Sequence, residues 1–179
     1  MDAIKSILKP GDVVLIEGQS RVSSAIQFIT NSNWSHAAIF IGKTDTCNHC
    51  LIEVKAVDGC RYTDIDVYMH HNLRICRPVF LNNRKRTVLI KYLIKKIGSK
   101  YDLKNIFDLI RFAYPNPPVP KKYRRNLIGI GAGDPTKAIC SSLIAEAFRE
   151  IGHPILPFKD EFKSIVLRHP SYCLPKDFD

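Results

Sequence analysis

The chain has 179 residues, with 27 Lys or Arg against 17 Asp or Glu, so its formal net charge is +10. A chain of this length can bury roughly two-thirds of its unfolded surface in one core, and we expect a single domain over residues 1–179. No apolar stretch approaches the roughly 20 residues that a membrane-spanning helix needs. The sequence therefore predicts a soluble or peripheral protein and excludes an integral one.

The first half of the chain consists mainly of short apolar runs that are typical of strands. The predicted strands cover residues 12–17, 35–42, 50–56, 59–65 and 73–80. A helix is expected at 20–30, with Ser20 as its N-cap. The runs 35–42 and 50–56 predict an antiparallel hairpin of two core strands.

The second half of the chain favours helices. The segment 84–97 places five apolar residues on one stripe, and the segment 103–114 shows a similar pattern. The apolar stripe of the first helix is Val88, Leu89, Tyr92, Leu93 and Ile97. Four prolines between 114 and 120 cannot continue a helix, so residues up to 133 form a long irregular insertion. A long loop before a reactive residue is a candidate lid.

Cys140 opens a third predicted helix. Apolar residues at 139, 143, 144, 147, 148 and 151 have the helical period, and Gly152 ends the pattern. Turn-forming residues 133–136 precede it, so Cys140 lies within about one turn of the helix start. Unpaired N–H groups there favour a thiolate, the reactive form of cysteine. The alternative is a buried structural cysteine.

His36 and Glu53 are the candidate partners of this thiol. If the hairpin folds symmetrically about residues 44 and 45, His36 lies directly opposite Glu53, with Cβ atoms roughly 5 Å apart. A glutamate in an apolar strand needs a partner, and a carboxylate beside an imidazole fixes its tautomer and orientation. The alternative is a histidine at a strand edge with an unrelated, solvent-facing glutamate.

Five segments occur in an order that matches one known family. They are residues 9–15, 32–39, 51–54, 98–102 and 139–144. Together they resemble the circularly permuted papain-like amidases, the YiiX-type branch of the NlpC-type cell-wall hydrolase superfamily. The resemblance implies an α+β fold, in which an antiparallel sheet packs against helices and the nucleophile begins a C-terminal helix.

The same resemblance implies a role for each candidate residue. Cys140 is the expected nucleophile, His36 the general base and then acid, and Glu53 the group that orients His36. The family carries an acid two positions after the cysteine, where this chain has Ser142. The expected reaction is hydrolysis of a peptide or isopeptide bond without a cofactor. The superfamily also includes lipid acyltransferases, so acyl-lipid or thioester chemistry on the same triad is the alternative.

Three aromatic residues are candidate walls of the substrate cleft. Trp34 lies two residues before His36, Tyr101 belongs to the Gly-x-x-Tyr-Asp segment, and Tyr114 begins the proline-rich insertion. Clefts that bind organic substrates are lined mainly by such side chains. With the basic clusters nearby, this composition predicts a preference for substrates with an apolar portion next to a negative charge.

The remaining cysteines raise the question of a metal. Cys47-Asn48-His49-Cys50 has the spacing of half a zinc site, but no second closely spaced pair follows. We therefore expect no metal and interpret the segment as a hairpin loop with exposed thiols. The lack of a secretory signal or a disulfide-scaffold spacing predicts a reducing, cytoplasmic location.

Basic clusters provide the rival interpretation. They lie at 84–86, 95–96 and 121–125. Such clusters can attract nucleic acid or an anionic membrane, but no nucleic-acid-binding module accompanies them. They are equally typical of solvated helix faces. The competing hypothesis is a catalytically inactive papain-like scaffold that binds its partner through the basic surface. If the active enzyme instead contacts an anionic membrane through these clusters, it is a peripheral membrane protein.

Overall fold

A five-stranded antiparallel sheet forms the centre of the computed structural model, with strand order β4-β3-β2-β1-β5. The structure describes residues 2–55, 58–100, 140–155, 158–159, 165–166, 169–170 and 173–179. The strands of the sheet are β1 (Val13–Glu17), β2 (His36–Gly42), β3 (Cys50–Lys55), β4 (Gly59–Asp64) and β5 (Asn72–Cys76). Two short strands, β6 (Phe158–Lys159) and β7 (Ile165–Val166), pair separately.

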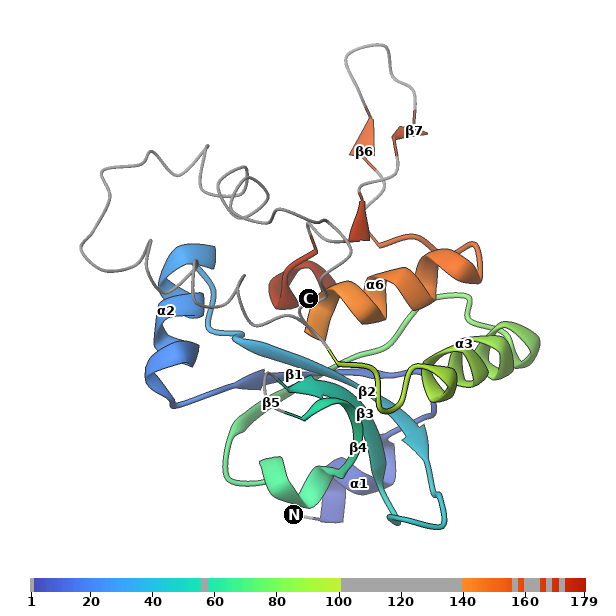
Figure 1. The fold of residues 1–179 in the computed structure, drawn as a ribbon, viewed down its shortest axis with the longest axis horizontal. Helices are drawn as coiled ribbons and strands as arrows, with labels where there is room; N and C mark the ends of the chain where they lie inside the picture. Colours follow the sequence, from blue (N-terminus) through green and yellow to red (C-terminus); the bar gives the residue numbers. More distant parts are fainter. Residues whose placement is uncertain are drawn as a thin grey trace.

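Helices cover both faces of the sheet (Figure 1). They are α1 (Asp2–Ile7), α2 (Arg21–Thr30), α3 (Asn83–Lys95) and α6 (Cys140–Glu150), with 3-10 turns η1 (Ile65–Tyr68) and η4 (Pro175–Phe178). Val13 and Leu15 face the apolar cluster of α3 and α6, whereas Val14 and Ile16 face a second cluster that includes Ile65 of η1. A sheet buried on both faces explains why the strands are apolar runs with little alternation. The predicted α+β architecture is confirmed.

Most predicted elements are present, with small changes at their ends. Ser20 caps α2 by accepting a hydrogen bond from the backbone N–H of Ser23 at 3.0 Å, as predicted. The last predicted strand, 73–80, ends early at Cys76, and residues 77–82 form a loop. Leu89 and Leu93 of α3 are fully buried, but Val88 is 45% exposed, so its assignment to the buried stripe is wrong. Val88 lies four residues after Arg84 and three before Lys91, which places it on their solvent face.

The β2–β3 hairpin forms, but not in the predicted register. Ile39 pairs with Ile52 and Phe40 with Leu51, and an irregularity before Gly42 shifts the pairing towards the turn. Continuing the first two pairs puts Glu53 opposite residue 38 and not opposite His36. The prediction was therefore off by two residues. An even shift keeps both side chains on one face, because side chains alternate with a period of two.

The segment between these strands corrects the cysteine prediction. Cys47 and Cys50 form a disulfide, and Cys50 is fully buried, so they are not exposed free thiols. A disulfide is more typical of oxidising compartments than of the cytoplasm. The cytoplasmic location stays a prediction, and the Cys47–Cys50 disulfide argues against it.

The predicted helix 103–114, the proline-rich insertion, and the turn 133–136 lie outside the described residues. Of the helices that the structure describes, none combines the length and the hydrophobicity needed to cross a bilayer.

Candidate active site

Cys140 is the first residue of α6 and is 7% exposed. The helix is amphipathic, and its buried side packs Leu143, Ala147 and Phe148 into the cluster between α6 and the sheet. The hydroxyl of Ser141 donates to the carbonyl of Cys173 at 2.7 Å, which ties the helix start to the C-terminal segment. Packing and this bond together fix the position of the thiol.

His36 meets Cys140 at the beginning of β2. It is the first residue of that strand, and its imidazole hydrogen-bonds the sulfur of Cys140. The Nε2 atom of His36 lies 2.9 Å from Oε2 of Glu53, so Nδ1 is the nitrogen left for the sulfur. The backbone N–H groups of Ala37 and Ser141 also donate to the sulfur. All three predicted catalytic residues are therefore brought together.

The electrostatics favour a thiolate–imidazolium pair. Burial opposes the charged form of His36, but hydrogen bonds and charge interactions with Cys140 and Glu53 outweigh it and raise its pKa to about 10. Burial likewise opposes the Cys140 thiolate, yet the His36 imidazolium and the backbone donors lower the pKa of that thiol. Because the pKa of His36 is raised and the pKa of Cys140 is lowered, the site favours the state in which the imidazole holds the proton and the sulfur is a thiolate.

Glu53 is a buried carboxylate with partners on both oxygens. Oε2 accepts from Nε2 of His36 and from the hydroxyl of Tyr68, while Oε1 accepts from Nε of Arg61 at 3.0 Å. Nζ of Lys55 lies 3.8 Å from Oε1. Burial raises the pKa of Glu53, but His36, Tyr68 and Lys55 outweigh it and lower the pKa to about 2. The carboxylate therefore stays ionised and holds the imidazole in place.

Sequence reasoning did not identify Arg61 and Tyr68. Arg61 is the direct cross-strand partner of Glu53 in the β3–β4 pairing, so an explicit register for the predicted strands 50–56 and 59–65 would have suggested it. Tyr68 lies in η1, a 3-10 turn that no hydrophobic pattern in the sequence predicted. Burial and the neighbouring Glu53 raise the pKa of Tyr68, so its hydroxyl remains a donor at neutral pH.

Of the three predicted cleft residues, the structure describes Trp34. Its ring packs against the cluster that contains Cys140, and its indole N–H donates to Asp179 at 3.0 Å. Tyr101 and Tyr114 lie outside the described residues, so their place in the cleft stays a prediction. Ser142, at the position where the family carries an acid, is buried, and its hydroxyl has no hydrogen-bond partner within the described residues.

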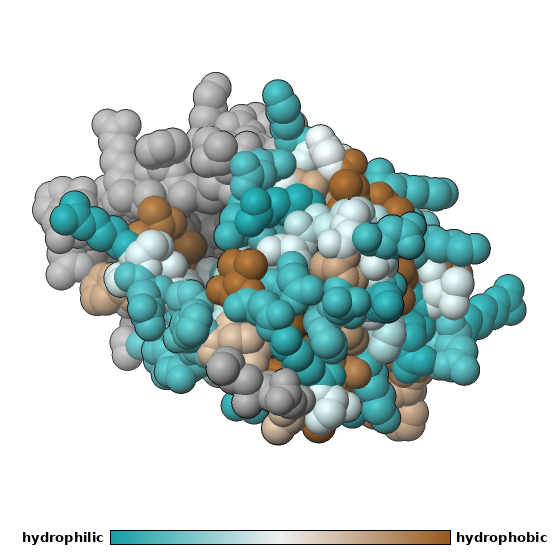
Figure 2. Space-filling view, turned by 90° about the horizontal axis from the view of Figure 1, so that it is seen from below, coloured by the Kyte–Doolittle hydropathy of each residue, from teal (hydrophilic) through white to brown (hydrophobic). Residues whose placement is uncertain are grey.

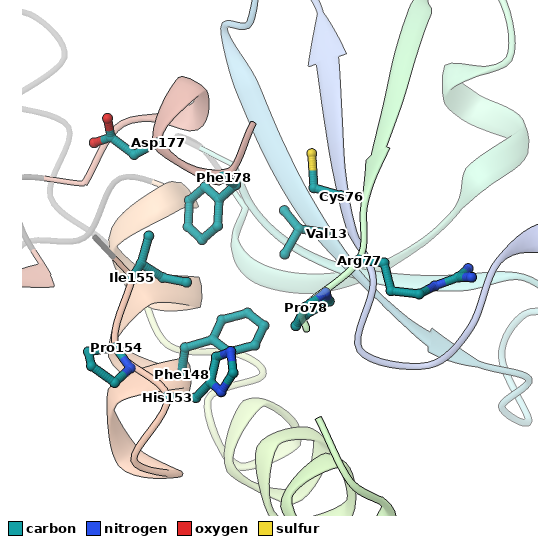
Figure 3. Close-up of a pocket in the computed structure, with 10 residues that line it drawn as sticks. All are labelled: Val13, Cys76, Arg77, Pro78, Phe148, His153, Pro154, Ile155, Asp177 and Phe178. Atoms are coloured by element: carbon teal, nitrogen blue, oxygen red, sulfur yellow. The ribbon is translucent and has the colours of Figure 1, made fainter. Parts of the chain in front are cut away.

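A cavity of about 190 Å³ lies at the other end of α6. Phe148 and His153 face Val13 and Pro78 across it, and Phe178 closes one side (Figure 3). Cys140, His36 and Glu53 do not line it. Within the described residues, no three His, Cys, Asp or Glu side chains are placed to hold a metal ion.

Comparison with known proteins identifies relatives of this chain. The profile of the family described as permuted papain-like amidase enzyme, YaeF/YiiX, C92 family, matches residues 7–114. The probable lipoprotein peptidase YaeF of Escherichia coli strain K12 is 24% identical over 164 residues. That match covers 83% of this chain but only 58% of YaeF, so the chain spans little more than half of its curated relative.

A solved structure supports the fold. The crystal structure of yiiX from Escherichia coli O157:H7, which is described as a metalloprotein, superposes with a TM-score of 0.58 at 17% identity. The match covers 92% of this chain and 77% of yiiX. At this identity the likeness establishes a shared fold, and it agrees with the predicted permuted papain-like architecture.

Proposed function

Because the chain belongs to the C92 family of permuted papain-like amidases, we propose that it cleaves an amide bond through an acyl-enzyme on Cys140. Membership makes it an enzyme of the papain-like amidase and peptidase type. The main support for the acyl-enzyme mechanism is the position of His36. Its imidazole hydrogen-bonds the sulfur of Cys140 on one side and Glu53 on the other. This is the triad logic of nucleophile, base and orienting group.

The reaction follows from the charges of these groups. The Cys140 thiolate attacks the carbonyl carbon, and the oxyanion that forms is stabilised by backbone N–H groups at the start of α6. The His36 imidazolium gives its proton to the amine as the carbon–nitrogen bond breaks, which leaves a thioester. Neutral His36 then takes a proton from water, and the hydroxide displaces the sulfur. The acid is released, and the thiolate–imidazolium pair is restored.

The proposed substrates are peptide or isopeptide bonds. The name of YaeF, a probable lipoprotein peptidase, supports cleavage of peptide bonds, although this chain spans only 58% of that relative. An amine or a lipid hydroxyl in place of water would convert the same intermediate into an acyltransferase reaction. The molecule that accepts the acyl group therefore distinguishes a hydrolase from an acyltransferase.

The test captures the intermediate. The protein is mixed with paired fluorogenic amide and ester substrates that share one acyl group, quenched in acid and analysed by intact mass and peptide mapping. We expect one acyl group on Cys140, none on Cys140→Ala, and full labelling of the control Cys76→Ala. Free acid as the product supports hydrolysis, whereas transfer to an added amine or lipid alcohol supports the alternative. Undiminished turnover by Cys140→Ala would refute the mechanism.

A further inference from the structure

The loop after β5 exposes two large apolar side chains at its tip. Val79 is 63% exposed and Phe80 is 91% exposed. These residues follow Arg77 and Pro78, which line the cavity at the end of α6 (Figure 3). We call Val79 and Phe80 the apolar tip. Single exposed apolar residues are common. An aromatic side chain that is almost completely exposed, however, contributes almost no hydrophobic free energy to the stability of the fold.

The backbone at Phe80 makes this placement more unusual. Its φ is 61°, in the left-handed region that bulky side chains rarely adopt and that Asn and Gly tolerate better. Phe80 therefore contributes little packing and strains the backbone. A residue that is unfavourable in the isolated fold is better explained by a contact made outside it.

The exposed residues of α3 lie on one stripe, and this helix begins three residues after Phe80 of the apolar tip. They are Asn83, Arg84, Thr87, Val88, Lys91, Ile94 and Lys95. The helix carries five basic residues, Arg84, Lys85, Arg86, Lys91 and Lys95, and no acidic one. Its opposite side is buried through Leu89 and Leu93. We call the stripe of Arg84, Val88, Lys91, Ile94 and Lys95 the basic face.

We propose that the apolar tip and the basic face together dock the protein on an anionic lipid membrane. The cations of the basic face complement acidic headgroups, and each basic residue near such a surface strengthens binding. Phe80, Val79 and the two aliphatic residues of the basic face would lie at the boundary of headgroups and acyl chains, where burying them is favourable. This fits the net charge of +10.

The aliphatic residues favour a membrane over nucleic acid. Val79, Val88 and Ile94 are 63%, 45% and 42% exposed, and they offer nothing to a polyphosphate backbone. The face seen from below the view of Figure 1 is mainly hydrophilic, with apolar residues in small separate groups (Figure 2). The docking surface therefore combines charge and hydrophobicity in a way that suits lipid.

Docking would leave the catalytic end of α6 accessible. Helix α3 is held to α6 by Glu146, which accepts from the Tyr92 hydroxyl at 2.6 Å and lies 3.6 Å from Nζ of Lys96. Arg77 and Pro78, which precede the apolar tip, line the cavity beside Phe148 of α6, whereas Cys140 begins that helix about 12 Å from Phe148, at 1.5 Å per residue. Cys140→Ala should therefore bind vesicles as the wild type does.

The test is vesicle co-sedimentation of the full chain. Vesicles of phosphatidylglycerol mixed with phosphatidylcholine are compared with vesicles of phosphatidylcholine alone, at low and high salt. We expect binding to the anionic vesicles only, weakened by salt. Lys91→Gln combined with Lys95→Gln should weaken binding by roughly fivefold per charge removed. Lys43→Gln, an exposed lysine in the β2–β3 loop, is the matched control and should change binding less than twofold by the same reasoning.

Phe80→Asn separates docking from folding. Asn suits the left-handed backbone, so we expect the variant to melt at the same or a higher temperature while binding anionic vesicles several-fold more weakly. Val67→Ser removes a valine of 55% exposure in η1 and serves as the apolar control. Unchanged vesicle binding by Phe80→Asn, equal binding to neutral vesicles, or tight binding to a short RNA or DNA without vesicle binding would each overturn the proposal.

Discussion

Replacing His36 by Ala should change how the reactivity of Cys140 depends on pH. In the wild type, the imidazolium keeps the pKa of Cys140 below its ordinary value of 9.0, against the opposing effect of burial. Without the imidazolium, burial remains, and the thiol should titrate at or above 9.0. At pH 7 a thiol with that pKa is only about 1% thiolate, so the reactive form falls by up to about a hundredfold, the full factor applying if the wild-type thiol is completely ionised at that pH.

The expected change in rate is smaller than the change in thiolate. A thiolate of higher pKa is intrinsically more nucleophilic, with a Brønsted slope of about 0.4–0.5, which recovers part of the loss. The alkylation rate of Cys140 should therefore fall by on the order of tenfold at pH 7. It should also rise about tenfold per pH unit from pH 6 to 8, whereas the wild-type rate should rise less steeply, because the pKa of its thiol is lower.

Limited iodoacetamide labelling followed by peptide mapping measures both rates. Cys60 and Cys76 act as internal standards, since burial raises the pKa of each, to about 11 for Cys60, and both should label slowly in every variant. His70→Ala, which removes an exposed histidine, is the matched control, and circular dichroism checks the fold. A wild-type rate that climbs as steeply as that of His36→Ala would show that no thiolate–imidazolium pair exists.

Two further predictions concern the carboxylate network. The pKa of Glu53 is about 2 in the fold against an ordinary 4.5, so its interactions stabilise the protein fully above pH 4.5 and are lost as pH falls through 2. A difference of about 2.5 in pKa corresponds to about 3 kcal/mol, and chemical denaturation should show this acid-dependent loss in the wild type but not in Glu53→Gln. Tyr68→Phe removes a donor to that buried carboxylate, which should cost about 1.5–3 kcal/mol at pH 7 by the same measurement. An unchanged free energy of unfolding in Tyr68→Phe would mean that the hydroxyl contributes nothing to holding Glu53.

The sequence predicted the strands and the helix start at Cys140 because both depend on local patterns. The apolar runs of β1 to β4 and the helical period of α6 can be recognised in the sequence without knowledge of the tertiary structure. The hairpin register was less accessible, because it depends on where the turn closes and on the irregularity before Gly42. The disulfide between Cys47 and Cys50 was missed for a related reason, since the spacing alone fits a disulfide, a metal site or a plain loop.

His36 and Glu53 lie together in spite of the wrong register, and the alternation of side chains explains this. A shift of two residues replaces a directly opposite neighbour by a diagonal one on the same face, which remains within reach of long side chains. Glu53 reaches His36 across that diagonal at 2.9 Å. A shift of one residue would have put the two groups on opposite faces and destroyed the prediction.

The same geometry explains why Glu53 needs more than one partner. A buried carboxylate that served only His36 would be an uncompensated charge whenever the imidazole is neutral, which the proposed reaction requires during deacylation. Arg61 and Lys55 supply positive charge at Oε1, and Tyr68 supplies a hydrogen bond at Oε2. Glu53 can therefore stay ionised through the whole cycle, because its charge is compensated even in the step in which His36 has given up its proton.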